Sequence, residues 1–72
     1  MDKFAERLKQ LRTERGFYQR DIGEALGVST AIITEYESGR KCPAFPRFIE
    51  LCKFLDVSSD YLLGLSDDPK HR

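Results

Sequence analysis

The sequence has little of what enzymes, secreted scaffolds and membrane proteins depend on. Its 72 residues include two cysteines, one histidine and no tryptophan, and two cysteines are too few for a disulfide framework or a four-ligand zinc site. The histidine, His71, is the second residue from the end, where we expect nothing to hold it in catalytic geometry. No apolar run approaches the roughly 18 residues of a membrane span, and no signal-peptide pattern is present. We therefore expect no enzyme, no metal or other cofactor, no small-molecule ligand and no membrane association.

What is present suits one small folded domain. Leu, Ile, Val and Phe occupy 19 of the 72 positions, about 26%, which exceeds the roughly 20% below which chains are typically disordered. The net charge of zero hides unequal blocks: residues 1–20 carry +3, residues 21–39 carry −4, residues 40–53 carry +3 and residues 54–72 carry −2. The basic segments are either solvated helix faces or flank a surface that approaches an anion, and composition does not choose between these.

The spacing of apolar residues predicts helices and almost no strand. Phe4, Leu8 and Leu11 recur at helical spacing ahead of Gly16, a typical helix-ending residue. Further helices are expected at about 19–26, at about 30–38 after a Ser29 cap, from about Pro46 to Leu55, and from a Ser58 cap to about Leu63. We predict an all-α, five-helix domain over residues 1–65 and a short, flexible tail at 66–72, which has nothing to bury.

The same spacing predicts which side chains form the core. They are mostly large and apolar, and Cys52 is expected to act among them as a small hydrophobe. The expected core residues are Phe4, Leu8, Leu11, Phe17, Ile22, Ala25, Leu26, Val28, Ile33, Tyr36, Phe48, Leu51, Cys52 and Leu55.

Residues 19–38 carry the most specific pattern. Two short helices that cross steeply over the turn Gly27-Val28-Ser29 need a glycine that leaves the first helix in a left-handed conformation, and Gly27 supplies it. They also need a small residue where they approach most closely, and Gly23 meets that need. This arrangement is a helix-turn-helix, whose second helix can enter the major groove of DNA.

Residues 4–64 resemble the Cro/repressor-type, lambda-repressor-like (XRE-type) helix-turn-helix family. The stretches that carry the resemblance are FAERLKQLRTERGFYQ, ALGVS, EYESGRK and VSSDYLLG. The resemblance implies a cytoplasmic transcription regulator of bacterial or phage type, with repression favoured over activation. It also implies a homodimer that binds a palindromic double-stranded DNA operator, with the recognition helix, residues 30–38, in the major groove and half-sites ~34 Å apart.

The resemblance further implies roles for individual residues. Base edges would be read by the outward face of the recognition helix, at Thr30, Ala31, Thr34 and Glu35. DNA phosphates would be bound at the start of the first motif helix and around the end of the second, by Gln19, Ser38, Arg40 and Lys41. A structural ion pair would join Arg12 to Glu37.

Four residues depart from the family pattern. Tyr18 stands where a capping Ser, Thr or Asn is usual, which removes a capping oxygen from the next helix. Glu35 replaces a basic or amide side chain, and either accepts a hydrogen bond from a cytosine N4 amine or stays a solvated charge. Ile32 either packs on a neighbouring loop or meets a thymine methyl group. Cys42 is expected as an exposed, reduced thiol, with a redox role as the alternative. Because residues 21–39 carry −4, non-specific DNA binding should be weak and strongly salt-dependent.

The fifth helix carries more apolar side chains than one short helix can hide. Tyr61, Leu62 and Leu65 are therefore candidate dimer contacts, with packing against the first and fourth helices as the alternative. A rival function for the same fold is an antitoxin-like or partner-binding module that holds another protein through Ile32, Tyr61 and Leu65. The acidic motif favours this rival, whereas Gln19 and the basic loop favour DNA.

Overall fold

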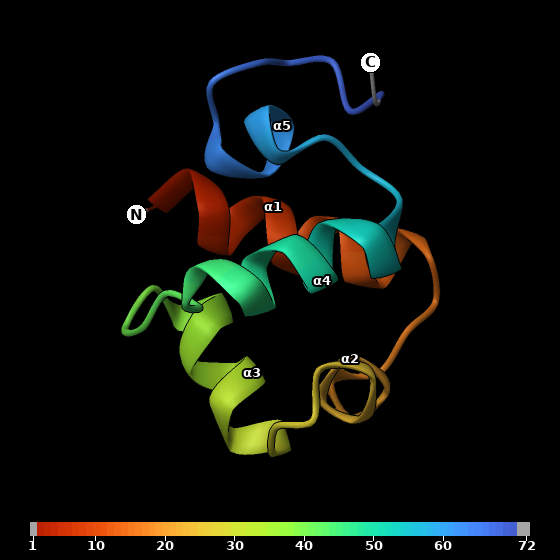
Figure 1. The fold of residues 1–72 in the computed structure, drawn as a ribbon, viewed down its shortest axis with the longest axis vertical. Helices are drawn as coiled ribbons and strands as arrows, with labels where there is room; N and C mark the ends of the chain where they lie inside the picture. Colours follow the sequence, from red (N-terminus) through yellow and green to blue (C-terminus); the bar gives the residue numbers. More distant parts are fainter. Residues whose placement is uncertain (1, 71–72) are drawn as a thin grey trace.

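The computed structural model describes residues 2–70, which form five α-helices and no strand (Figure 1). They are α1 (Asp2–Glu14), α2 (Gln19–Leu26), α3 (Thr30–Ser38), α4 (Phe45–Leu55) and α5 (Ser59–Leu63). The predicted all-α, five-helix fold is confirmed, and α2 and α3 have the predicted bounds. His71 lies outside the described residues. Within them, no helix has the length and apolar character needed to span a membrane.

The central helix of the bundle is α1. It packs against α3 and α5, while α2 packs against α3 and α4. The rings of Phe4 and Phe48, with centroids 6.0 Å apart, join α1 to α4. Figure 1 shows α5 at one end of the molecule and the α2–α3 pair at the other. The outer faces of α2 and α3 therefore belong to the same end of the bundle.

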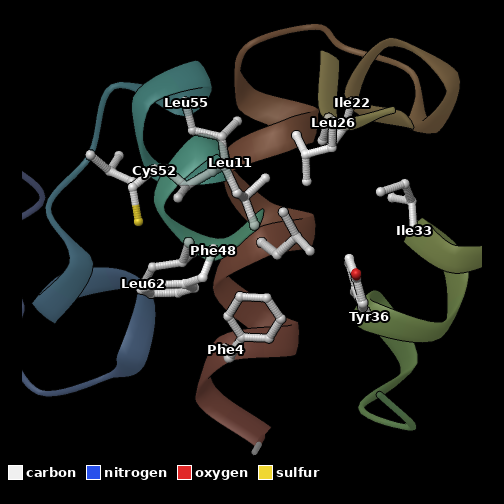
Figure 2. Close-up of a cluster of buried hydrophobic side chains, with 13 residues drawn as sticks. Phe4, Leu11, Ile22, Leu26, Ile33, Tyr36, Phe48, Cys52, Leu55 and Leu62 are labelled. Carbon is white, nitrogen blue, oxygen red and sulfur yellow. The ribbon is translucent and has the colours of Figure 1, made fainter. Parts of the chain in front are cut away.

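One cluster of 13 buried side chains, drawn from all five helices and from Val57 before α5, forms the core (Figure 2). In α3 the side chains of Ile33 and Tyr36 point into it, which leaves the opposite face of that helix outside. Three predicted core positions differ. Ala25 is exposed, while Phe17 and Val28 are only partly buried and pack against the edge of the cluster.

The ends of α2 and α3 follow from local chemistry. Gly27 ends α2 with φ at 72°, and the Ser29 hydroxyl caps α3 by accepting from the Ile32 N–H at 3.4 Å. As expected, the Tyr18 side chain does not cap α2. The Asp21 carboxylate compensates, since it accepts a hydrogen bond from the Tyr18 N–H at 2.7 Å and places a negative charge in the first turn.

Gly23 lies where α2 meets the turn that leads to α3. A Cβ atom built at this position would be 2.8 Å from the carbonyl oxygen of Val28, well inside the ~3.5 Å at which non-bonded atoms attract. The Val28 N–H also donates to the Gly23 carbonyl at 2.9 Å. The backbone itself thus occupies the space that a side chain would need, in agreement with the prediction of a small residue here.

The predicted dimer contact at Leu62 is corrected by its burial. Leu62 is 0% exposed and belongs to the core cluster, so its side chain is not available to another molecule. In a helix of only five residues the sequence pattern shows too little periodicity to distinguish the inner face from the outer. Tyr61 is partly buried, whereas Leu65, just after the helix, is 76% exposed.

The segment after Leu65 makes contacts that the sequence does not reveal. The buried Arg7 side chain donates to the carbonyl oxygens of Tyr61 and Ser66, each at 2.6 Å, and pairs with Asp67 at 2.8 Å. The Ser58 N–H donates to the Pro69 carbonyl at 2.9 Å. Residues 66–69 therefore have hydrogen-bond partners on α1 and at the start of α5, and the domain boundary at residue 65 stays a prediction.

Candidate nucleic-acid interface

The outward face of α3 presents the four residues predicted to read bases. Thr30, Ala31 and Thr34 are exposed, and the Glu35 side chain is 34% exposed. Ile32, also on α3, packs partly against the core. α3 therefore offers a short, mostly polar surface with one carboxylate.

Gln19 lies beside α3 and is held by it. The Thr34 hydroxyl is 2.9 Å from the Gln19 Oε1, to which it donates, and 3.2 Å from the Thr30 carbonyl, an alternative acceptor. The Gln19 Nε2 donates to the Glu37 carboxylate at 3.2 Å. An amide nitrogen has two hydrogens, so one of them remains for a ligand while the other fixes the side chain. The start of α2 is thereby oriented relative to α3 through side chains as well as through the turn.

Arg12 and Glu37 form a nearly enclosed ion pair between α1 and α3. The Arg12 Nε donates to one Glu37 oxygen at 2.6 Å and the second guanidinium contact, to the other oxygen, is 3.2 Å. The side chains are 14% and 5% exposed, and Arg12 also donates to the Phe17 carbonyl at 3.0 Å. A bidentate pair of this kind fixes direction as well as distance. It holds the C-terminal part of α3 against α1.

The loop after α3 carries its basic side chains next to Glu35. The Lys41 Nζ is 3.6 Å from the Glu35 carboxylate, and the backbone N–H groups of Arg40 and Lys41 both donate to the Glu35 carbonyl. Arg40 is exposed and has no ion pair among residues 2–70. The Ser38 hydroxyl donates to the Glu35 carbonyl at 3.0 Å, so its hydrogen is already engaged. The loop thus presents to solvent the Arg40 guanidinium, unpaired within the described chain, whereas the Lys41 ammonium is paired with Glu35.

Two open hollows flank Gln19 and reveal basic residues that the sequence pattern does not assign to the interface. One is lined by Arg12, Tyr18, Gln19, Arg20 and Thr30. The other is lined by Lys9, Arg12, Gln19, Thr34, Glu37 and Ser38. For Lys9, helical spacing could have indicated this position. Lys9 precedes Arg12 by three positions and therefore lies on the same side of α1.

The two cysteines differ in environment. Cys52 is 7% exposed, and burial raises the pKa of its thiol, so that the unreactive protonated form is favoured. Cys42 is exposed. Within residues 2–70 no group of three or more His, Cys, Asp or Glu side chains is arranged to hold a metal ion.

Large apolar side chains are also exposed outside this region. Phe45 and Ile49 on α4 are 74% and 39% exposed, and Leu65, just after α5, is 76% exposed. The guanidinium of Arg7 lies 4.2 Å from the ring centroid of Tyr61, which fixes that ring against α1 and leaves it partly buried.

Known proteins resemble this chain in sequence and in structure. The helix-turn-helix family model matches residues 8–62. The uncharacterized HTH-type transcriptional regulator YobD of Bacillus subtilis (strain 168) is 35% identical over 66 residues, which are 92% of this chain and 59% of that protein. The HTH-type transcriptional activator BcrR of Enterococcus faecalis is 38% identical over 62 residues, which are 86% of this chain and 30% of that protein. The chain therefore spans only part of the length of these relatives.

Among solved structures, the P22 c2 repressor protein in complex with synthetic operator 9T matches with a TM-score of 0.82. The two sequences are 30% identical, and the match covers 88% of this chain and 96% of that one. The shared architecture is that of an all-α, lambda-repressor-like helix-turn-helix domain.

Proposed function

This chain belongs to the helix-turn-helix family of transcriptional regulators, and on that premise we propose that it binds a specific double-stranded DNA sequence and regulates transcription there. The family predicted from the sequence is confirmed, and it is not an enzyme family. The observation that carries the proposal is the outward face of α3, where four small or polar side chains stand free of the core beside a basic loop.

The residue types on that face suit the major groove. Thr30 and Thr34 can contact bases through a hydroxyl or a methyl group, and Ala31 can pack on a thymine methyl. The Glu35 carboxylate can accept a hydrogen bond from the N4 amine of cytosine. Because the Lys41 ammonium lies 3.6 Å from it, part of the repulsion between this carboxylate and nearby phosphates is offset. We assign base reading to these residues of α3.

We assign phosphate binding to residues around α3 that have hydrogen-bond donors not already used within the described part of the protein. Gln19 has one amide hydrogen left after its bond to Glu37, and Arg40 is exposed and unpaired within the described chain. Lys41 reaches a phosphate by leaving Glu35, or binds while bridging both. Ser38 can take part only if its hydroxyl gives up the bond to the Glu35 carbonyl. We therefore propose Gln19 and Arg40 as the main contacts, with Lys41 and Ser38 as secondary ones.

We further propose that the protein acts as a homodimer on a palindromic operator and that it represses transcription. The exposed Leu65, with the partly buried Tyr61 beside it, remains the proposed dimer surface. Repression has the support of the similarity to the P22 c2 repressor, although BcrR is an activator. A cytoplasmic location follows from the proposed target.

The experiment that tests the proposal is selection from random double-stranded DNA at low salt, with sequencing of the bound pool. We expect enrichment of a palindrome whose half-sites are about one helical turn, ~34 Å, apart. Enrichment of a single, non-palindromic site would contradict the dimer while leaving DNA recognition intact. No enrichment from protein that circular dichroism shows to be helical would contradict sequence-specific binding itself.

Exposed apolar side chains support a second candidate, the protein-interaction module. Phe45 and Ile49 line an apolar hollow that reaches Val57 and Ser59 at the start of α5, and Leu65 is exposed after α5. Ile32, which the sequence also suggested for such a surface, is partly buried against the core. This function would replace DNA binding only if the selection experiment fails.

A further inference from the structure

We propose that Lys9 of α1 and Arg20 of α2 bind DNA phosphates on either side of Gln19. In this arrangement the DNA backbone is held by α1 and α2 as well as by the loop after α3. The inference rests on the proposed DNA-binding function and identifies two contacts that neither the sequence pattern nor the family resemblance assigns.

The first hollow beside Gln19 places Arg20 next to the edge of the recognition helix. Its lining includes Arg20, Tyr18 and Thr30, so a strand that meets the start of α3 passes over it. The Arg20 guanidinium lies 5.1 Å from the centroid of the Tyr18 ring. Tyr18 is 66% exposed, which is unusual for a large aromatic side chain. Stacking on this ring restricts the guanidinium to fewer orientations, so that less freedom is lost when it meets an anion.

The second hollow places Lys9 on the other side of Gln19. Lys9 is exposed, and the hollow that it lines also includes Gln19, Thr34 and Ser38. Both hollows share Gln19 and Arg12, so they adjoin one another along the junction of α1, α2 and α3. Two cations therefore line adjoining hollows that share Gln19, for which the family resemblance implies a phosphate contact.

The charges around Gln19 leave Lys9 and Arg20 as available cations. Arg12 is committed to Glu37 at 2.6 Å, and Lys41 is partly neutralised by Glu35. Among the described residues, neither Lys9 nor Arg20 forms an ion pair. DNA carries one negative charge per ~1.7 Å of helix axis, and residues 21–39 add −4 on the protein side. Cations outside that segment must supply the attraction.

The salt dependence of DNA binding tests the inference. Binding of a random-sequence duplex is measured by fluorescence anisotropy at several salt concentrations for the wild type, Lys9→Gln and Arg20→Gln. The slope of log K against log salt is expected to flatten by about 0.9 for each phosphate that a variant no longer neutralises. Lys53→Gln is the matched control, because Lys53 is exposed on α4 and lines the apolar hollow instead. It removes the same charge and should leave the slope at the wild-type value.

The outcomes separate this inference from the function on which it rests. If Arg40→Gln flattens the slope while Lys9→Gln and Arg20→Gln behave like Lys53→Gln, the two contacts are absent and DNA binding stands. If the wild type fails to bind any duplex at low salt, both the function and the inference are overturned. Thermal melting of each variant verifies the fold, since both side chains are exposed and their replacement should leave the melting temperature unchanged.

Discussion

The negative charge of Glu35 is unfavourable for its proposed role in reading DNA bases, but a basic side chain lies close enough to offset part of that charge. The Lys41 ammonium lies 3.6 Å away, and the carboxylate remains 34% exposed. Such exposed pairs contribute little to stability, typically below about 1 kcal/mol. The pair is therefore assigned to the proposed DNA-binding surface rather than to structural support of the fold.

Replacing Glu35 by Gln should shift the base preference at one operator position from cytosine toward adenine, by about 1–3 kcal/mol. A carboxylate accepts from the cytosine amine, whereas an amide pairs with two atoms of adenine. The measurement is competition binding with single-base variants of the selected site. Glu50→Gln, an exposed position on α4, is the control. An unchanged preference at every position would contradict base reading by Glu35.

The ion pair of Arg12 and Glu37 should contribute to stability because both side chains are almost enclosed. Glu37→Gln leaves the nearly enclosed Arg12 guanidinium without its counter-charge, and we expect the free energy of unfolding to fall by about 3 kcal/mol. Urea denaturation followed by circular dichroism measures this change, and Glu50→Gln again serves as the control. A free energy of unfolding equal to that of the wild type would show that the pair has no structural role.

At the level of the elements, the junction of α2 with the turn leaves no room for a methyl group. Gly23→Ala should destabilise the fold by about 1–3 kcal/mol, because the new Cβ would stand 2.8 Å from the Val28 carbonyl oxygen and force the backbone apart. Glu24→Ala, at the exposed neighbouring position, should change stability by less than about 0.5 kcal/mol. Urea denaturation measures the free energy of unfolding of both variants and so tests this prediction. Equal stability of the two variants would mean that the Val28 carbonyl does not occupy the space beside Gly23 as described.

The elements also show where sequence reasoning succeeds. The bounds of α2 and α3 could be predicted because Gly27, Ser29 and Gly39 act locally, through left-handed backbone and a side-chain cap. The same holds for the need of a small residue at Gly23. These features depend on neighbours within a few positions, which the sequence displays directly.

Other features could not be predicted because they join distant parts of the chain. Arg7 meets Ser66 and Asp67, 59 and 60 positions away, and no local pattern indicates such a partner. Gln19 could be matched to a phosphate contact, but not to its bonds with Thr34 and Glu37. For Leu62 the sequence leaves a dimer contact and packing against the first and fourth helices both open, because five residues show too little periodicity to tell an inner face from an outer one.

At the scale of the whole molecule, two surfaces compete as explanations of function. One consists of α3, the start of α2 and the loop after α3, with its polar and charged side chains. The other is apolar and consists of the α4 hollow that Phe45 and Ile49 line, with the exposed Leu65 after α5 as a further apolar side chain. A net charge of zero provides no overall attraction to DNA, so the proposed DNA binding requires the local arrangement of cations on the first surface to provide it.

The measurement that tests the central claim most directly is a titration of the ¹⁵N-labelled protein with a DNA duplex at low salt, followed by nuclear magnetic resonance. A random sequence suffices, because contacts to phosphates do not depend on the base sequence. The account predicts the largest shifts at amides of residues 18–20, 30–35 and 39–41. Largest shifts around Phe45, Ile49 and Leu65, or none at all, would contradict it.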